Sequence, residues 1–292
     1  MGQLKALLLA GAVAFGAIGT AHAADLPPPP PFEGVAPEPV EFGGWYLRGD
    51  VGVGSSLRPT IRSTFAADVT VPNSRFDQRN LGDSAFVGGG VGYQVNNWLR
   101  FDATGEYRTA QGLTATESYN AGFFLTPPTN ARAFDTYTGQ VQSTVALANF
   151  YIDAFHWNRF GLFFGGGVGG SFNQVSNLTD IGVGGTNTGF GYARERSGVS
   201  LAYQGTVGLA YDVTPNLKLE LAYRYLDMGD VRSGAINCQN TGTCPHEVQK
   251  ISLASQDVKI GMRWLFDDAG YAPPPPAPYY PPPPPAPLVR KY

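Results

Sequence analysis

The tightest constraint on this fold is a period-two alternation from Ser255 to Phe266, which reads SQDVKIGMRWLF. Alternate side chains of an extended strand point to opposite faces. One face is apolar and ends in two aromatic rings: Val258, Ile260, Met262, Trp264 and Phe266. If that face meets lipid, a shift of one residue would place Lys259 and Arg263 in hydrocarbon, at about 2–4 kcal/mol each. The register of this strand is therefore strongly fixed.

Seven earlier runs share this alternation: Trp45 to Gly54, Ala85 to Val95, Trp98 to Arg108, Gln142 to Phe155, Phe160 to Gln174, Val199 to Val213, and Asn216 to Met228. Short turns follow the second, fourth and sixth runs, whereas 24 to 33 residues follow the first, third, fifth and seventh. Short turns at one rim and long loops at the other are typical of outer-membrane barrels. A soluble lipocalin also has eight strands, but its apolar face points inward. The pattern predicts an all-β fold, an eight-stranded antiparallel transmembrane β-barrel.

The charged faces are expected to line the lumen, because the many apolar side chains would overfill any interior that a chain of this length encloses. An eight-stranded barrel is just wide enough for its side chains to fill it. A lone buried charge is costly, so mixed signs favour a paired network. Its predicted members are Arg48, Asp50, Arg100, Asp102, Glu106, Asp153, Lys218, Glu220, Arg224, Lys259 and Arg263. Inward glycines, such as Gly90 and Gly167, either leave a narrow water path or make room for Arg and Tyr side chains.

Both ends of the chain are predicted to lie outside the barrel. Lys5, the apolar run Ala6 to Ile18, and Ala21-His22-Ala23 form a signal peptide that is cut between Ala23 and Ala24. We therefore expect a signal peptide at 1–23, a Pro-rich linker at 24–43, the barrel at 44–266, and a Pro-rich tail at 267–292. Proline-rich segments are disordered or extended and pack no core. They serve either as spacers or as periplasmic arms that meet peptidoglycan or a protein partner.

Charge and motif spacing exclude several function classes. A net charge of -3, with 15% charged residues and no basic cluster, argues against nucleic-acid binding. Cys238 and Cys244 are expected to form a disulfide in an exported loop; a metal site with His246 is the less favoured alternative. The GGGVGG stretch lacks the Lys-Ser/Thr of a phosphate loop, and no Ser–His arrangement for acyl chemistry is visible. We expect neither an enzyme nor a cofactor.

Several motifs together resemble a known family. They are the cleavage site, the DLPPPPP spacer, GWYLRGDVGVG, LANFYIDA and the final DVKIGMRWLF. The chain is similar in these to the small outer-membrane β-barrel surface proteins of alphaproteobacteria, a porin-like surface-antigen group. The resemblance implies that Trp264 and Phe266 are the signal read by the barrel-insertion machinery. Family members usually stop at that aromatic, whereas this chain continues to Tyr292.

The resemblance also implies a location and a role. We expect an outer-membrane protein of a Gram-negative envelope, in contact with lipid and lipopolysaccharide, with a structural or surface-interaction function. Loop aromatics such as Tyr119, Phe123 and Phe124 are the expected contact points. Two alternatives remain open: a narrow porin for small solutes, and a surface binder of haem or another small ligand.

Overall fold

The computed structural model describes residues 43–64, 74–124, 129–184, 189–239 and 246–266. These all lie in the unit Glu41–Tyr292. The predicted signal peptide with its Ala23–Ala24 cleavage site, almost all of the Pro-rich linker, the Pro-rich tail and Cys244 lie outside the described residues. Within the described part of the chain, no helix is long and apolar enough to cross a membrane.

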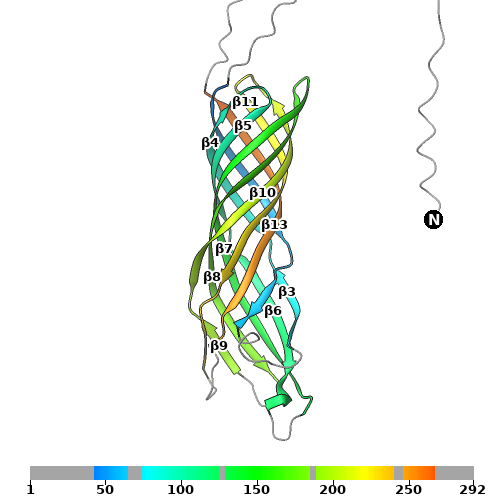
Figure 1. Cartoon of the computed structure of the whole chain (residues 1–292), viewed down its shortest axis with the longest axis vertical. Coiled ribbons are helices and arrows are strands. Elements are labelled where there is room, and N and C mark those ends of the chain that lie inside the picture. Colours follow the sequence, from blue (N-terminus) through cyan, green and yellow to red (C-terminus); the bar gives the residue numbers. More distant parts are fainter. Residues whose placement is uncertain (1–42, 65–73, 125–128, 185–188, 240–245, 267–292) are drawn as a thin grey trace, which may run out of the picture. The chain divides into compact units, whose positions relative to one another are not determined.

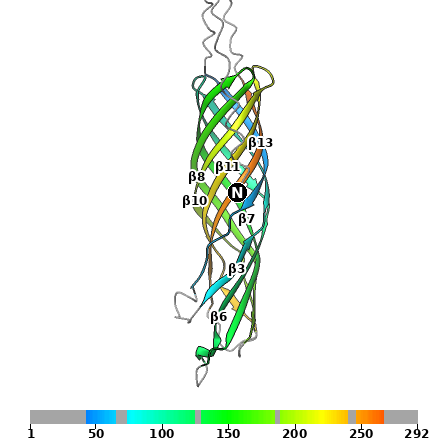
Figure 2. The same cartoon turned by 90° about the vertical axis from the view of Figure 1, so that its right-hand side faces the viewer.

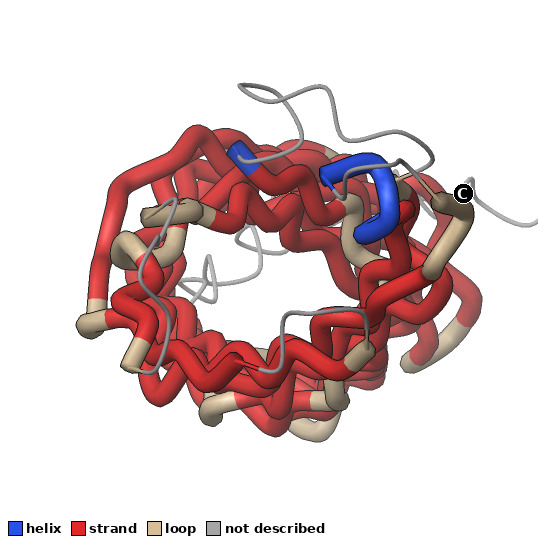
Figure 3. The backbone as a smooth tube through the Cα atoms, turned by 90° about the horizontal axis from the view of Figure 1, so that it is seen from below, coloured by secondary structure: helices blue, strands red, loops and turns tan. Residues whose placement is uncertain are grey.

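Eight antiparallel strands close into a ring, which confirms the predicted fold class. The ring closes because β7 and β8 pair with each other and β1 pairs with β13. Figures 1 and 3 show the resulting tube from the side and along its length. In chain order the strands are β1 (Trp45–Ser56), β4 (Ser84–Gln94), β5 (Leu99–Arg108), β7 (Arg132–Trp157), β8 (Phe160–Val183), β10 (Arg196–Asp212), β11 (Leu217–Arg232) and β13 (Gln249–Leu265).

The strand registers bring apolar residues together on the outside of the ring. Val258 of β13 lies opposite Val53 of β1 and Tyr223 of β11. All three side chains are exposed. The next residue, Lys259, is only 5% exposed and faces inward. The alternation in the sequence is therefore the alternation between the outer surface and the lumen.

The exposed apolar side chains form a continuous band around the ring, which we call the apolar belt. Aromatic residues concentrate at the short-turn rim, where the rings of Trp45 and Tyr93 lie 5.4 Å apart and those of Phe160 and Tyr211 lie 5.0 Å apart. Such girdles mark the interface between lipid and water. The belt comprises Trp45, Leu47, Val51, Val53, Val87, Val91, Tyr93, Phe101, Tyr107, Phe150, Ile152, Phe160, Phe164, Val168, Phe172, Val199, Leu201, Tyr203, Val207, Leu209, Tyr211, Leu219, Leu221, Tyr223, Val258, Ile260, Met262 and Trp264.

The long connections are not simple loops, because most of their described residues continue the β-structure. β7 begins ten residues before the predicted Gln142, and β8 runs nine residues beyond the predicted Gln174. Short strands pair with these prolonged ends along the path β3-β6-β7-β8-β9-β12, and β2 pairs with β13. The added elements are β2 (Ile61–Ser63), β3 (Arg75–Leu81), β6 (Gln111–Asn120), the 3-10 turn η1 (Ala121–Phe124), β9 (Gly189–Ala193) and β12 (Ile236–Cys238).

We call these added elements, together with the ends of β7, β8, β10, β11 and β13 that pack with them, the extension; Figures 1 and 2 show it below the ring. Its interior is an apolar core, in contrast to the charged lumen of the ring. That core comprises Ile61, Leu81, Leu113, Ala115, Tyr137, Val141, Val145, Leu147, Val175, Leu178, Ala193, Ala202, Leu226, Met228, Val231, Ile236, Ile251 and Leu253. Burial of this apolar surface stabilises β-structure that would otherwise be exposed loop.

Candidate functional site

The lumen near the short-turn rim holds a network of ion pairs centred on Arg48. Its Nη1 atom lies 2.8 Å from Asp102 Oδ2, and its Nη2 atom lies 2.8 Å from Asp50 Oδ1. Glu220 lies at the centre of a second group, with Arg100 at 3.1 Å and Arg263 at 3.2 Å. These side chains are nearly completely buried. Opposite charges at such distances offset the cost of removing each ion from water.

Further along the lumen, two arginines share two carboxylates. Arg108 contacts Glu106 and Asp257, each at 2.9 Å. Arg224 contacts the same two carboxylates at 2.7 and 2.5 Å. Both guanidinium groups also lie against the ring of Phe86, at 4.9 and 4.8 Å from its centroid. Arg108 and Arg224 thus hold a set of ion pairs that lies further from the short-turn rim than the Arg48 network.

Two amide side chains connect the Arg48 network with the ion pairs of Arg224. Asn149 Nδ2 donates to Asp102 Oδ1 at 2.7 Å, and Gln204 Nε2 donates to Asn149 Oδ1 at 2.6 Å. Arg224 Nη1 then donates to Gln204 Oε1 at 3.4 Å. The polar interior is thus one hydrogen-bonded network that crosses the lumen.

The inward glycines leave room for side chains from neighbouring strands. A Cβ atom at Gly92 would overlap the ring of Tyr46, and one at Gly165 would overlap the ring of Tyr151. Tyr46 in turn donates a hydrogen bond to Asp102 Oδ2 at 3.1 Å. The space at these two glycines is filled by side chains rather than by a water path.

The structure brings ten of the eleven predicted lumen residues into these ion pairs, with Asp153 at 3.3 Å from Arg100, and separates Lys218 from them. Lys218 pairs with Asp212 at 2.7 Å in a partly exposed position near the short-turn rim. Lys259 lies 3.5 Å from Asp50, at the edge of the Arg48 group. Two ionic partners lie outside the predicted set, namely Arg108 and Asp257. Their positions in the alternation are a signal that identifies them as inward-facing.

The remaining predicted site residues lie at the two ends of the molecule. Trp264 and Phe266 are about half exposed, and the Phe266 amide donates to the Trp45 carbonyl at 2.9 Å. Cys238 ends β12, and because Cys244 is outside the described residues, their pairing stays a prediction. Within the described part of the chain, no group of three or more His, Cys, Asp or Glu residues is arranged to hold a metal ion.

Four carboxylates gather inside the extension, and we call them the acidic cluster: Glu117, Asp135, Asp180 and Glu247. Glu117 of β6 lies directly opposite Asp135 of β7. Tyr137 donates to Glu247 Oε1 at 3.0 Å and to Glu117 Oε2 at 3.4 Å. Like charges in cross-strand positions repel each other. A cluster of this kind is stable only if some of the carboxyl groups hold protons or accept hydrogen bonds.

Burial and mutual repulsion raise the pKa values of these carboxyl groups. The pKa of Asp135 is raised to about 7, first by burial and then by Glu247 and Glu117. The pKa of Asp180 is raised to about 8, first by burial and then by Asp135, Glu247 and Glu117. Burial also raises the pKa of Glu117 and of Glu247. The cluster therefore holds protons at a pH where ordinary carboxyl groups are ionised.

This cluster is absent from the sequence-based prediction, because that prediction assigns the segments that carry the four carboxylates to long loops. A signal exists, since Leu113, Ala115, Glu117 and Tyr119 alternate with Thr114, Thr116 and Ser118. Tyr119 was expected to be an exposed contact residue, and that expectation is wrong, because only 8% of it is exposed. The side chains of Phe123 and Phe124 lie outside the described part of the structure.

An exposed apolar surface lies on the outside of the extension, over β7, β8 and β9. We call it the extension patch: Phe134, Ile181, Val183, Phe190 and Tyr192, each more than 40% exposed. Phe134 lies opposite Val183, and Ile181 lies opposite Phe190. Polar residues separate this patch from the apolar belt, including Thr138 and Thr179, whose hydroxyl groups lie 2.7 Å apart. The patch is therefore distinct from the surface that faces lipid.

Comparison with known families gives one match that covers most of the chain. Residues 10–241 match the outer membrane protein beta-barrel domain. The match spans the seven ring strands from β1 to β11. It therefore covers every ring strand except β13, together with most of the extension.

Individual relatives and solved structures are more distant. A protein of Brucella abortus (strain 2308) is 28% identical over 220 residues, which cover 72% of this chain and 76% of that protein. A putative adhesin of Rickettsia conorii is 25% identical over 195 residues, which cover 65% of this chain and 70% of the adhesin. The outer membrane protein OprG from Pseudomonas aeruginosa is 12% identical, with a TM-score of 0.41 and coverage of 78% of this chain and 97% of OprG.

Proposed function

Because this chain belongs to the outer membrane protein beta-barrel domain family, we propose that it is a closed barrel of the outer membrane whose extension binds a protein partner at the cell surface. The apolar belt holds the ring in lipid. The extension presents the contact surface in water. The role is one of structure and surface interaction rather than catalysis.

The proposed orientation follows from the two ends of the tube. The short-turn rim faces the periplasm, and the extension faces the outside, as in barrels whose extracellular connections are the longer ones. The extension continues the barrel for some ten residues of β7 beyond Gln142. At about 3.3 Å per residue, such a projection reaches well beyond the hydrocarbon layer.

The extension patch is the observation that carries this proposal. Its five apolar side chains lie side by side on three paired strands and project into water if the belt occupies the membrane. A contiguous exposed apolar patch with a polar rim is typical of protein interaction sites. Aromatic side chains such as Phe134, Phe190 and Tyr192 are enriched at such interfaces. The Rickettsia conorii relative, described as a putative adhesin, supports a contact of this kind.

The filled lumen supports this role over that of a narrow porin. Arg48, Asp102 and Glu220 occupy the lumen near the short-turn rim, and Arg108 and Arg224 occupy it further along. Planar-bilayer recordings of the purified full chain test the alternative. We expect no steady ion-scale openings. Openings whose conductance changes in Arg100→Ala or Arg263→Ala would favour the porin.

The contact function is tested by adhesion of bacteria that display the protein. The full chain is produced in the outer membrane of a non-adherent Gram-negative strain, and adherence to cultured cells is counted. In the test variant, Phe134, Ile181 and Phe190 are replaced by Ser. The matched control carries Thr114→Ser, Thr138→Ser and Thr179→Ser on the outside of the same extension. Whole-cell surface labelling measures whether all three proteins reach the surface in equal amounts.

We expect the unchanged protein and the threonine control to increase adherence, and the patch variant to lose that increase. Equal adherence of the patch variant would show that this surface is not the contact site. If the unchanged protein itself gives no increase, the surface-contact role is wrong for these cells, and the protein is a structural barrel alone.

The proposal includes four sequence expectations that concern the ends of the chain and one loop. They are cleavage between Ala23 and Ala24, insertion guided by Trp264 and Phe266, a periplasmic contact of the Pro-rich tail with peptidoglycan or a protein, and a disulfide between Cys238 and Cys244. N-terminal sequencing of the mature protein tests the first. Deletion of residues 269–292 separates a role of the tail in insertion from a role in anchoring.

A further inference from the structure

Three basic side chains form a row across neighbouring strands on the outside of the molecule. Lys250 of β13 lies opposite Arg62 of β2 on one side and opposite Arg232 of β11 on the other. We call Arg62, Lys250 and Arg232 the basic row. Directly opposite side chains have Cβ atoms about 5 Å apart, where like charges destabilise a sheet. An anion bound to this row would therefore reduce the repulsion among its three cations.

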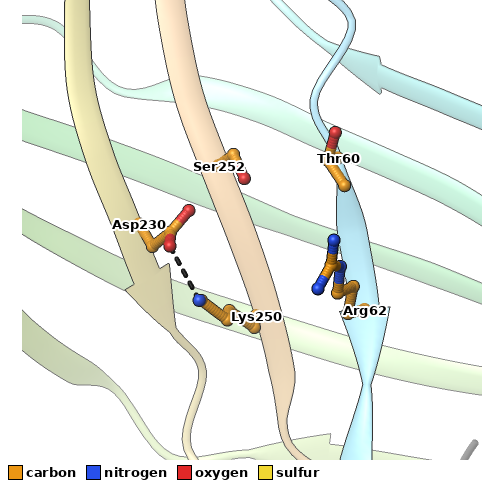
Figure 4. A pocket seen from close by; sticks show the side chains of 5 residues that line it. All are labelled: Thr60, Arg62, Asp230, Lys250 and Ser252. Carbon is orange, nitrogen blue, oxygen red and sulfur yellow. Dashed lines mark ion pairs between the residues drawn. The ribbon is translucent and has the colours of Figure 1, made fainter.

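Two hollows flank this row and share Arg62 and Lys250. The first, shown in Figure 4, is lined by Thr60, Arg62, Asp230, Lys250 and Ser252 and encloses about 210 Å³. The second adds Arg196 and Arg232 to its lining and encloses about 270 Å³. Hydroxyl groups of Thr60 and Ser252 provide neutral donors beside the cations. The two hollows together offer charged and neutral donors to an anionic group.

The cations of this surface outnumber its acidic partners. Lys250 pairs with Asp230 at 2.8 Å, and each of these two side chains is 42% exposed. Within the described part of the chain, Arg62, Arg196 and Arg232 take part in none of the ion pairs, and all three are exposed. The positive charge of Arg62 also reaches Asp230, whose pKa is lowered first by its hydrogen bond to Lys250. Four cations against one carboxylate leave a net charge of +3.

The Arg232 end of the basic row borders the apolar belt on the β10 side. Val199 and Leu201 are 78% and 68% exposed, the highest values of the belt on β10. The adjacent Ser200 hydroxyl donates to the Asp230 carbonyl, which places Asp230 beside this edge. Arg232 lies two residues beyond Asp230, and Arg196 lies three residues beyond Val199. At about 3.3 Å per residue, both arginines lie within roughly 10 Å of the last lipid-facing side chains.

We propose that the basic row, together with Arg196, binds the phosphate groups of lipopolysaccharide in the outer leaflet. The apolar belt contacts the acyl chains. The guanidinium groups of Arg62, Arg196 and Arg232 donate paired hydrogen bonds to phosphate oxygens, a geometry that the guanidinium fork favours. Lys250 and the hydroxyls of Thr60 and Ser252 complete the site.

The position of the row favours a lipid headgroup over a soluble polyanion. A sulfated polysaccharide from another cell would meet the tip of the extension first, near the acidic cluster. The row instead lies at the side of the tube, and its Arg232 end lies near Val199 at the edge of the belt. The phosphate group of a lipid in the same membrane lies near the edge of the belt, so it can contact these side chains while the lipid stays in the leaflet. This site is independent of the extension patch and of the function proposed for it.

The test measures binding of defined ligands to the purified full chain in zwitterionic detergent micelles. The ligands are bisphosphorylated lipid A, the same lipid A without phosphates, and heparin fragments. The test variant replaces Arg62, Arg232 and Lys250 by Gln. The control replaces three exposed cations elsewhere, Arg75, Arg132 and Arg159, by Gln and so removes the same charge. Heat-modifiable migration on a denaturing gel tests whether each variant is folded.

We expect the test variant to bind bisphosphorylated lipid A on the order of a hundredfold more weakly, since each basic residue near an anionic membrane contributes about fivefold. The control is expected to bind like the unchanged protein, and lipid A without phosphates is expected to bind all three proteins equally weakly. Equal losses in test and control variants would overturn the site, because general charge would explain them. Equal binding of both lipid A forms would overturn the phosphate assignment. If the test variant loses heparin binding but keeps lipid A, the row belongs to a soluble polyanion.

Discussion

Arg48 and Asp102 are in contact across an intervening strand: Arg48 Nη1 donates to Asp102 Oδ2 at 2.8 Å, although β1 and β5 are both paired with β4 and not with each other. The contact passes over two glycines of β4, because Gly90 lies opposite Arg48 and Gly92 lies opposite Asp102. A Cβ atom at Gly90 would overlap the Ala103 carbonyl and Thr104, and one at Gly92 would overlap the Tyr46 ring, which itself donates to Asp102. The glycines of β4 and the charges of the lumen are therefore parts of one arrangement.

Replacement of Arg48 by Met tests how far this network stabilises the ring. The change leaves Asp50, Asp102 and Glu220 without a shared cation in a buried site. Loss of one partner of a buried ion pair typically costs about 3–5 kcal/mol. We expect the free energy of unfolding in detergent, followed by urea titration and gel mobility, to fall by that amount.

The matched control for this change is Lys218→Met. Lys218 forms an ion pair with Asp212 of similar length, but its side chain is 14% exposed and that of Asp212 is 29% exposed. Solvent-accessible pairs contribute about 0–1 kcal/mol. A similar loss in both variants would show that burial of the Arg48 network does not determine its contribution.

Replacement of Gly92 by Ala tests the fit between the glycines and the lumen side chains. The added Cβ atom would overlap the Tyr46 ring, which donates to Asp102, whereas a Cβ atom at Gly105 meets nothing within 4 Å. Overpacking a filled interior typically costs about 1–3 kcal/mol. We expect Gly92→Ala to lower the urea midpoint and Gly105→Ala, on the belt surface, to leave it unchanged. An unchanged midpoint in Gly92→Ala would mean that the lumen has free space.

The eight ring strands could be predicted because lipid imposes a strict rule on them. Every second residue from Val258 to Phe266 is apolar, and most outward positions of the other ring strands are apolar as well. The inward positions of Arg48 and Asp102 follow from this parity. Their pairing does not, because which residues meet across the lumen depends on the stagger of all eight strands.

The extension could not be predicted from the same rule, because its outer face meets water. Thr114 and Thr116 of β6 face outward, and its inward face mixes Leu113 and Ala115 with Glu117 and Tyr119. The contrast between the two faces is therefore weak, and Gly, Ser and Thr in these segments are equally typical of loops. The acidic cluster and the apolar core both depend on pairings between segments far apart in the sequence.

Replacement of Leu253 by Ala tests the apolar core of the extension. Leu253 is 1% exposed, whereas Leu201 on the belt is 68% exposed. A Leu→Ala change in a packed core typically costs about 2–5 kcal/mol, because a cavity remains. We expect faster hydrogen exchange in β6 and β12 of Leu253→Ala, with the ring strands unaffected. Leu201→Ala is the control, and equal exchange in both variants would contradict a separate core.

The acidic cluster predicts that the extension becomes less stable as pH rises. The pKa of Asp135 is raised from 3.8 to about 7 and that of Asp180 from 3.8 to about 8, first by burial and then by neighbouring carboxylates. Between about pH 4 and pH 8 the folded extension therefore binds more protons than the unfolded chain, so its stability falls with rising pH. The contribution is fully present below about pH 4 and is lost as pH passes the folded pKa values.

Hydrogen exchange in β6 and β7, corrected for the intrinsic pH dependence of exchange, measures this effect. We expect protection to decrease from about pH 5 to about pH 8 in the unchanged protein, because the ionised carboxylates repel one another in a buried site. The double variant Asp135→Asn, Asp180→Asn removes the two groups that titrate in this window and should show nearly constant protection. Asp83→Asn, an exposed carboxylate outside the cluster, should behave like the unchanged protein. Protection that rises with pH in the unchanged protein would mean that cations neutralise the cluster in solution.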